Sequence, residues 1–316
     1  MNSALKNYAA YVNNKIDVCE ISLNQYISTD NILQNKQGIE CAASLPIQGG
    51  KVTAFKKGDI LLANIRPYLK KIWYAQFDGG CSADVLAIRA NAKTDSHFLF
   101  YALFRDDFFI HAMKGAKGTK MPRGDKTQIM EFKIPVFDLK TQQSIAAVLS
   151  ALDKKIALNK QINARLEEMA KTLYDYWFVQ FDFPDANGKP YKSSGGDMVF
   201  DETLKREIPK GWGSIELQSC LAKIPNTTKI LNKDIKDFGK YPVVDQSQDF
   251  ICGFTNDEKS ILNPQDAHII FGDHTRIVKL VNFQYARGAD GTQVILSNNE
   301  RMPNYLFYQI INQIDL

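Results

Sequence analysis

Residues 141–180, TQQSIAAVLSALDKKIALNKQINARLEEMAKTLYDYWFVQ, decide the architecture of this 316-residue chain. Apolar residues recur there at alternating intervals of four and three, which keeps them on one face of an α-helix. The stretch contains neither Gly nor Pro, so we expect one helix about 60 Å long at about 1.5 Å per residue. We call the residues with this spacing the seam: Ile145, Leu149, Leu152, Ile156, Asn159, Asn163, Leu166, Ala170, Leu173 and Trp177.

Two features indicate that this helix needs a partner helix and, in addition, another protein. A second apolar stripe follows a different face, so that one neighbour cannot cover all of the apolar surface. Asn159 and Asn163 lie on the seam near its midpoint, where polar residues specify register and partner at a cost in stability. The alternative is an ordinary helix of a hydrophobic core.

Similar sequence patterns lie on the two sides of the helix. The strand pattern that begins at Asp59 matches the one that begins at Asp266. Three further matches follow in the same order: 71–77 with 278–285, Gly79 with Gly288, and 98–101 with 305–308. One such match can arise by chance, but four in order favour an internal duplication.

The predicted fold class is therefore α+β, with two mixed α/β recognition domains joined by a long helix of the coiled-coil type. The predicted boundaries are 1–137 for the first domain, 138–183 for the spacer helix, 184–207 for a turn-rich linker and 208–316 for the second domain. The second domain ends just after its aromatic helix, so we expect it to lack a spacer helix of its own.

Composition narrows the class of protein. A hydrophobic fraction of 45% argues for a folded chain, and the sequence shows neither a signal peptide nor a transmembrane run, so a cytoplasmic protein without membrane association is expected. The five cysteines are scattered and indicate neither disulfides nor zinc. Residues 1–137 carry 18 Lys and Arg against 12 Asp and Glu, a net charge of +6, whereas 184–316 carry 15 against 17, a net charge of −2. The first domain is thus better suited to a polyanion.

The sequence indicates a binding protein and not an enzyme. It contains no dinucleotide or phosphate-binding glycine motif, no nucleophile elbow and no metal-ligand spacing. The segment 114–126, KGAKGTKMPRGDK, is the strongest binding element, because glycines let backbone N–H groups and flexible cations approach a phosphate. A solvated surface loop is the alternative. The candidate residues of this segment are Lys114, Lys117, Thr119, Lys120, Arg123 and Lys126.

Three smaller clusters are further candidates for DNA contact. Segment 64–71 supplies Arg66, Tyr68, Lys70 and Lys71, which could equally form a salt-bridged strand end. Segment 271–279 supplies His274, Thr275, Arg276 and Lys279, although Asp273 and Arg276 could simply pair with each other. Gln246 and Ser247 have side chains able to read base edges, but such residues are equally common in ordinary loops. All of these residues are taken from the sequence.

Several of these motifs together resemble the specificity subunit of type I restriction-modification systems. They are Gly58-Asp-Ile-Leu, the loop that leads into Ile134-Pro, Gln143-Ser-Ile-Ala-Ala-Val-Leu, Leu152-Asp-Lys-Lys-Ile, Ile208-Pro-Lys-Gly-Trp and Phe271-Gly-Asp-His-Thr-Arg. The likeness covers nearly the whole chain.

The resemblance implies a non-catalytic subunit with two target recognition domains, each of which reads one half of a split double-stranded DNA target. It also implies that the spacer helices set the gap between the half-sites and dock two methyltransferase subunits, which bind S-adenosylmethionine, and that restriction subunits can join. The chain itself would bind no cofactor and no metal. The competing hypothesis is a non-enzymatic protein–protein scaffold with two duplicated binding modules. Because a second spacer helix is missing from the sequence, we hypothesise that a second copy of the chain fills the seam and gives a homodimer. The alternative is that the seam stays exposed and makes the protein dependent on partners.

Overall fold

The computed structural model describes residues 2–46, 50–116, 118, 120–222 and 227–314. The chain divides into two compact units, Met1–Ile162 and Asn163–Leu316. The division falls within the long helix. The predicted α+β class, with a long helix between two β-rich regions, is confirmed.

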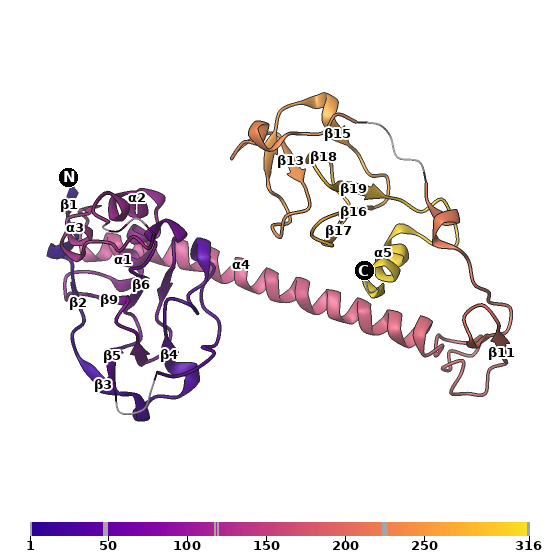
Figure 1. Ribbon diagram of the computed structural model, residues 1–316, viewed down its shortest axis with the longest axis horizontal. Helices are drawn as coiled ribbons and strands as arrows, with labels where there is room; N and C mark the ends of the chain where they lie inside the picture. The colour runs from indigo at the N-terminus through magenta and orange to yellow at the C-terminus, as the bar shows by residue number, and fades with distance from the viewer. Residues whose placement is uncertain (1, 47–49, 117, 119, 223–226, 315–316) are drawn as a thin grey trace. The chain divides into compact units, whose positions relative to one another are not determined.

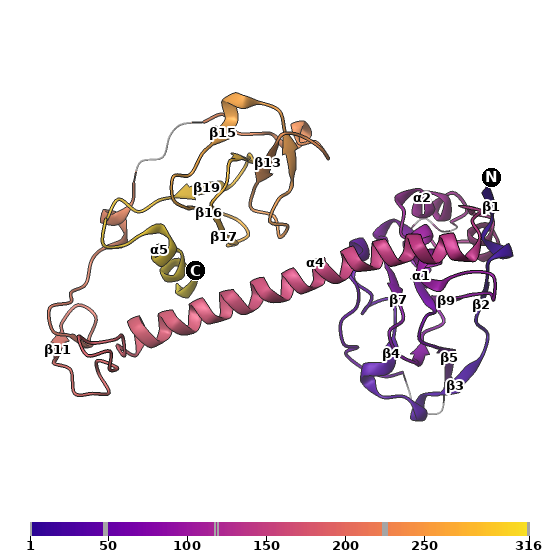
Figure 2. The ribbon, with the colours of Figure 1, turned by 180° about the vertical axis from the view of Figure 1, so that it is seen from behind.

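The first unit contains two four-stranded sheets (Figures 1 and 2). One has the order β2-β9-β6-β7 and is antiparallel throughout, and the other has the order β3-β5-β8-β4, in which β4 and β8 are parallel. A separate pair joins β1 to β10. The strands are β1 (Asn2–Ala4), β2 (Ala9–Tyr11), β3 (Lys15–Asp17), β4 (Tyr26–Ile27), β5 (Lys51–Phe55), β6 (Ile60–Ala63), β7 (Ile72–Tyr74), β8 (Gly79–Cys81), β9 (Val85–Ala90) and β10 (Lys133–Pro135).

Strand β6 lies at the centre of the first unit because both of its faces are apolar. Ile60 and Leu62 belong to a core that includes buried side chains of three helices, whereas Leu61 and Ala63 belong to a second core. The alternation follows from the two-residue period of a strand. The helices are α1 (Ser96–Leu103), α2 (Asp106–Lys114) and α3 (Lys126–Met130).

The second unit repeats this plan with fewer strands. Its sheets have the orders β17-β16-β19 and β14-β13-β18-β15, and helix α5 packs on β16 and β17. The elements are β13 (Tyr241–Val244), β14 (Gly253–Thr255), β15 (Ile261–Leu262), β16 (His268–Gly272), β17 (Val278–Val281), β18 (Tyr285–Arg287), β19 (Thr292–Ile295) and α5 (Asn304–Gln313).

Strand pairing supports the duplication. In the first unit, β6 pairs with β7 and β9, and in the second, β16 pairs with β17 and β19, all antiparallel. Strand β8 has β4 as its parallel neighbour and β5 as its antiparallel neighbour. Strand β18 likewise has β13 as its parallel neighbour and β15 as its antiparallel neighbour. The remaining strand of each four-stranded sheet differs, because β3 pairs with β5 whereas β14 pairs with β13. The pairing that the two units share, in the same chain order, is difficult to explain without a repeat.

The register corrects one of the sequence matches. Gly80 is the partner of Tyr26 and Ala54, and Ala286 is the partner of Val243 and Ile261, so Gly80 corresponds to Ala286. The match of Gly79 with Gly288 would have placed Gly80 on Ala289, and it is therefore wrong by three residues. The cause is a length difference between hairpins: the β6–β7 loop spans 64–71 and the β16–β17 loop spans 273–277.

Helix α4 (Leu139–Tyr174) is one unbroken helix of 36 residues, and a π-helical turn at Asp175–Val179 continues it (Figure 1). The predicted continuous helix is thus confirmed. Its first turns are fixed to the first unit by buried Gln142, whose side chain accepts a hydrogen bond from Asp95 N at 2.9 Å and donates to Phe137 O at 2.9 Å. Farther along, the Tyr101 hydroxyl donates to Asp153 at 2.7 Å.

The segment predicted as a linker contains a hairpin. Strands β11 (Met198–Asp201) and β12 (Arg206–Pro209) pair antiparallel. The turn between them is held by Asp201, whose carboxylate accepts the backbone N–H groups of Thr203 and Leu204, each at 2.8 Å. Turn residues in this segment were visible in the sequence, but the short strand pattern beside them was missed.

Candidate nucleic-acid interface

Two basic segments of the first unit, which the sequence presents as separate clusters, meet in the fold. The backbone N–H of Arg66 donates to the carbonyl of Pro122 at 2.7 Å, and that of Gly124 donates to the carbonyl of Asn64 at 3.0 Å. Ile65 and Arg123 form an antiparallel bridge between these bonds. The β6–β7 hairpin loop and the end of the 114–126 segment therefore form one surface.

Local sequence explains this junction. A Cβ atom on Gly124 would lie 2.9 Å from Asn64 Oδ1 and 3.1 Å from Ile129 Cδ1, so only glycine fits without displacement. The next residue, Asp125, is the N-cap of α3 and accepts the N–H groups of Thr127 and Gln128 at 2.8 and 3.0 Å. Its carboxylate thus satisfies helix-end donors.

Exposed cations surround the junction. Lys114, Lys120 and Lys126 are exposed, and Arg123 is exposed although its guanidinium lies 3.1 Å from Asp84. Tyr68, at the tip of the hairpin loop, is 51% exposed, which suits it to stacking or groove contact. The predicted residues Lys117 and Thr119 lie outside the described residues.

Arg66 has an unusual environment. Its backbone is left-handed, with φ 52°, and its Nε atom is buried without a hydrogen-bond partner. Among the residues that the structure describes, its guanidinium forms no ion pair. The rest of the side chain is only half-buried, so the guanidinium can reach a ligand outside the protein.

Lys70 and Lys71, predicted as DNA contacts, are engaged within the protein. The ammonium of Lys70 lies 3.0 Å from the Asp106 carboxylate, to which Lys36 also donates at 2.7 Å. These two lysines hold the pKa of Asp106 below its usual value. Lys71 donates to the carbonyl of Thr29 at 2.6 Å. For this pair the alternative interpretation, a braced strand end, describes the structure better.

In the second unit, the β16–β17 hairpin loop presents three of the predicted residues. His274, Thr275 and Arg276 are all exposed. Asp273 does not pair with Arg276 but accepts a hydrogen bond from Gln293 at 3.0 Å, and no described residue pairs with the Arg276 guanidinium. The proposed turn-fixing ion pair is therefore absent from the described part of the chain, and Arg276 keeps its charge available.

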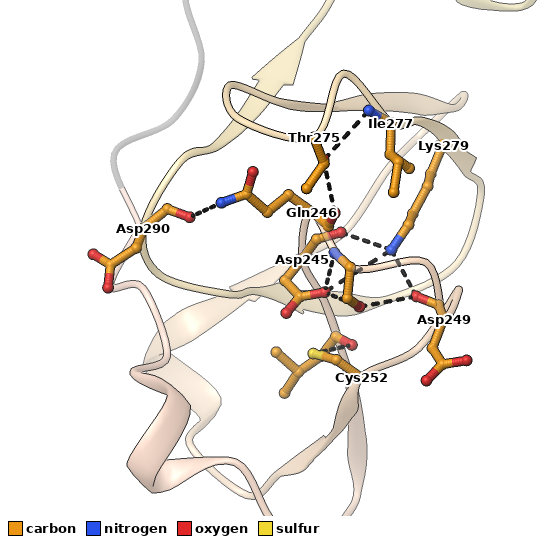
Figure 3. Close-up of polar contacts among 10 residues, drawn as sticks. Asp245, Gln246, Asp249, Cys252, Thr275, Ile277, Lys279 and Asp290 are labelled. Atoms are coloured by element: carbon orange, nitrogen blue, oxygen red, sulfur yellow. Dashed lines mark hydrogen bonds and ion pairs between the residues drawn. The ribbon is translucent and has the colours of Figure 1, made fainter. Parts of the chain in front are cut away.

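Gln246 holds this loop in place (Figure 3). Its side-chain amide donates to Asp290 O at 2.8 Å and accepts from His274 N at 3.2 Å. The backbone carbonyl of Gln246 accepts from the Thr275 hydroxyl at 2.8 Å. Ser247 is engaged locally, because its hydroxyl donates to the Asp245 carboxylate at 2.5 Å. Neither side chain is left free to read a base edge, so both are better described as positioning residues.

Lys279 requires a correction, because it is only 4% exposed. Its ammonium donates to the carbonyls of Asp245 and Asp249, both at 2.7 Å, and lies 3.9 Å from the Asp245 carboxylate (Figure 3). Burial lowers the pKa of Lys279, while Asp245 opposes that change. Lys279 is thus engaged within the protein, and a structural role describes its position better than the predicted DNA contact.

Sequence reasoning missed the residues that shape these loops. Asn64, Pro122 and Gly124 join the two segments of the first unit, and Asp245 anchors Lys279 in the second. The sequence signal for these close contacts was a glycine in each loop region, Gly124 and Gly272. A Cβ on Gly272 would lie 2.3 Å from the Thr275 hydroxyl and 2.7 Å from Gln246 Cβ, so there is no room for a side chain.

The seam of α4 forms the second candidate surface. Leu152, Ile156 and Leu166 are 54%, 54% and 57% exposed, which is far more than a core helix would leave open. Ile145, Leu149 and Trp177 are partly covered, and Asn159, Asn163 and Leu173 are exposed. Val148, Leu158 and Met169 add to the apolar surface, with 62%, 55% and 66% exposure. Exposed apolar side chains gathered along one helix, with the two asparagines between them, make this helix a candidate interaction surface.

In the described ranges, no group of three or more His, Cys, Asp or Glu side chains could hold a metal ion. Nor does that part of the chain contain a helix with the length and apolarity needed to span a bilayer.

Comparison with known proteins places these features in a family. The type I restriction modification DNA specificity domain matches residues 6–168, just over half of the chain. The HindI specificity subunit of Haemophilus influenzae is 34% identical over 168 residues, which are 50% of this chain and 36% of that protein. The EcoDI specificity subunit of Escherichia coli is 32% identical over 123 residues, 38% of this chain and 27% of that protein. The chain thus spans about a third of the length of these relatives.

A solved structure supports the fold. The S subunit of a type I restriction-modification system from M. genitalium superposes with a TM-score of 0.53 at 15% identity, covering 99% of this chain and 76% of that one. At this level of identity the likeness concerns the fold alone.

Proposed function

The chain belongs to the type I restriction-modification specificity family, whose members are not catalytic, and from this premise we propose that each of its two domains binds one half of a divided DNA target. The observation that carries the proposal is the repeated plan: in each unit a central strand pairs antiparallel with the next strand, and the hairpin loop between them contains an arginine, Arg66 or Arg276. Two equivalent binding surfaces on one chain suit two half-sites.

Helix α4 would set the distance between the half-sites. Its 36 residues span about 54 Å at about 1.5 Å per residue. Major-groove sites one turn of DNA apart are about 34–36 Å from each other, so a helix of this length can separate two domains that grip consecutive turns. A stiff connection fixes the gap, whereas a flexible linker would permit many gaps.

The seam would take protein partners. We propose that its exposed leucines and isoleucines pack against a second helix and that two methyltransferase subunits, with S-adenosylmethionine in their own sites, dock beside it. Restriction subunits could then join the complex. A second copy of this chain is our candidate for the second helix, and light scattering at micromolar concentration tests it, since a monomer would contradict it. We propose the cytoplasm as its site of action.

Charge reversal at the basic junction tests DNA binding. The double variant Lys120→Glu/Lys126→Glu removes two exposed cations of the junction, so affinity for duplex DNA should fall and the dependence of log K on log salt should become shallower by about 0.9 per lost phosphate contact. Lys56→Glu/Lys57→Glu is the control with the same change in net charge, because both lysines are exposed between β5 and β6, at the opposite end of β6 from the hairpin loop.

Two outcomes would contradict the proposal. If the double variant and the control bind DNA like the unmodified chain, the result favours the hypothesis of a protein–protein scaffold. If binding weakens equally in both, the effect reflects net charge and not the junction. Mapping of adenine methylation by the complex with its methyltransferase should reveal two half-sites at a constant gap.

A further inference from the structure

The two hairpin loops share a feature that composition does not require. Each contains one arginine with a left-handed backbone, Arg66 with φ 52° in the β6–β7 loop and Arg276 with φ 57° in the β16–β17 loop. A side chain with a Cβ adopts this conformation only at a cost in free energy, and such residues cluster at functional sites. The two loops occupy the same place in the two units, although their lengths differ.

The backbone around each arginine is held from both sides. Arg66 N donates to Pro122 O at 2.7 Å, and Arg66 O accepts from Leu69 N at 2.9 Å. Arg276 N donates to Gly272 O at 2.9 Å, and the loop before it is fastened by Gln246. Because the bonds fix each backbone, the arginine side chains start from defined positions.

These two arginines also differ from two other arginines of the first unit. Arg89 and Arg123 are paired with Asp59 and Asp84, whereas neither Arg66 nor Arg276 has a hydrogen-bonded or ionic side-chain partner among the described residues. For Arg66 even the buried Nε lacks a partner, although buried polar atoms are normally satisfied. A ligand that accepts hydrogen bonds would satisfy the buried Nε of Arg66, and the exposed guanidinium of Arg276 is open to such a ligand.

We propose that Arg66 and Arg276 are the corresponding specificity-determining residues of the two domains, each reading a base edge in its own half-site. The inference rests on the proposed function. A guanidinium presents a planar fork of donors that matches the O6 and N7 acceptors of guanine in the major groove. A fixed backbone favours this use, because base reading depends on geometry, whereas a phosphate contact can be made by a flexible lysine.

The experiment is selection of bound sequences from a randomised duplex pool by the full chain, alone and with its methyltransferase. The Arg66→Ala variant should lose its base preference at positions of one half-site only. The Arg276→Ala variant should lose its base preference at positions of the other half-site only. Discrimination at those positions should fall by about fivefold to more than a hundredfold. Arg301→Ala, which removes an exposed guanidinium outside the hairpin loop, is the matched control and should leave both half-sites unchanged.

Lysine variants separate base reading from charge. Arg66→Lys and Arg276→Lys keep the positive charge but lose the fork, so they should lose preference like the alanine variants while the salt dependence stays unchanged. If the lysine variants keep full preference, or the alanine variants weaken all sequences uniformly, the contacts are to phosphate and the inference is overturned. Circular dichroism of each variant shows that it is folded.

The failure of this inference is distinct from failure of the proposed function. If the unmodified chain selects two half-sites but the arginine variants select the same ones, only the assignment of these residues is wrong. If both variants alter the same half-site, the one-arginine-per-domain assignment is also wrong. If the unmodified chain selects no sequence in either setting, the proposed function fails and this inference fails with it.

Discussion

Lys279 offers a quantitative test of the distinction between structural and DNA-binding cations. Lys279→Met keeps most of the apolar stem but removes two charge-assisted hydrogen bonds to Asp245 O and Asp249 O, both of 2.7 Å. Such bonds contribute about 1.5–3 kcal/mol each, and relief from burying an ammonium offsets part of the loss. We expect the second unit to be destabilised by about 2–4 kcal/mol.

Hydrogen exchange of the full chain measures this effect, since the protection of β13 and β17 reports on the second unit separately from the first. Arg276→Met is the matched control in the same hairpin. Loss of this exposed guanidinium, which pairs with no described residue, should change stability by less than about 0.5 kcal/mol while weakening DNA binding. The reasoning would be refuted if Lys279→Met left protection unchanged and reduced DNA affinity as Arg276→Met does.

Three further predictions concern single side chains. Gly124→Ala places a Cβ 2.9 Å from Asn64 Oδ1, so it should destabilise the first unit by about 1–3 kcal/mol and weaken DNA binding; unchanged melting and affinity would count against the junction. Asp106→Asn releases Lys70 from its ion pair, and a nitrocellulose filter assay should show tighter DNA binding with a stability change of at most about 1 kcal/mol. Burial lowers the pKa of His268, so the folded state binds the proton less readily than the unfolded chain, and the second unit should lose stability as pH falls through about 6.5. The free energy of unfolding of His268→Gln, measured with urea, should not show that loss at low pH. If the variant and the unmodified chain have the same pH profile, His268 is not the cause of the loss.

The fold features that could be predicted from sequence are those encoded locally. The α4 helix follows from a periodic apolar pattern without Gly or Pro, and the duplication follows from the order of strand patterns. The match of Gly79 with Gly288 is wrong because these two glycines follow hairpins of unequal length, so matching them misaligns the strands. Strand register depends on partners far along the chain, so sequence matching alone could not set it.

The candidate site was predictable as a set of cations, but not as a set of available cations. Lys70 and Lys71 are engaged by Asp106 and Thr29, residues distant in sequence, and Lys279 by the loop that follows β13. For Arg276 the sequence suggested an ion pair with Asp273, but the Asp273 carboxylate accepts a hydrogen bond from Gln293 instead, so Arg276 remains available. Such choices are made by tertiary packing, which the residue pattern does not record.

The length of α4 provides the most direct test of the account. Insertion of a second copy of residues 152–158 adds one heptad, which preserves the seam and lengthens the helix by about 10.5 Å, or about three base pairs at about 3.4 Å each. Methylation mapping with the lengthened chain should show the same two half-sites separated by about three more base pairs. An unchanged gap, with both half-sites still modified, would contradict the claim that this helix sets the spacing.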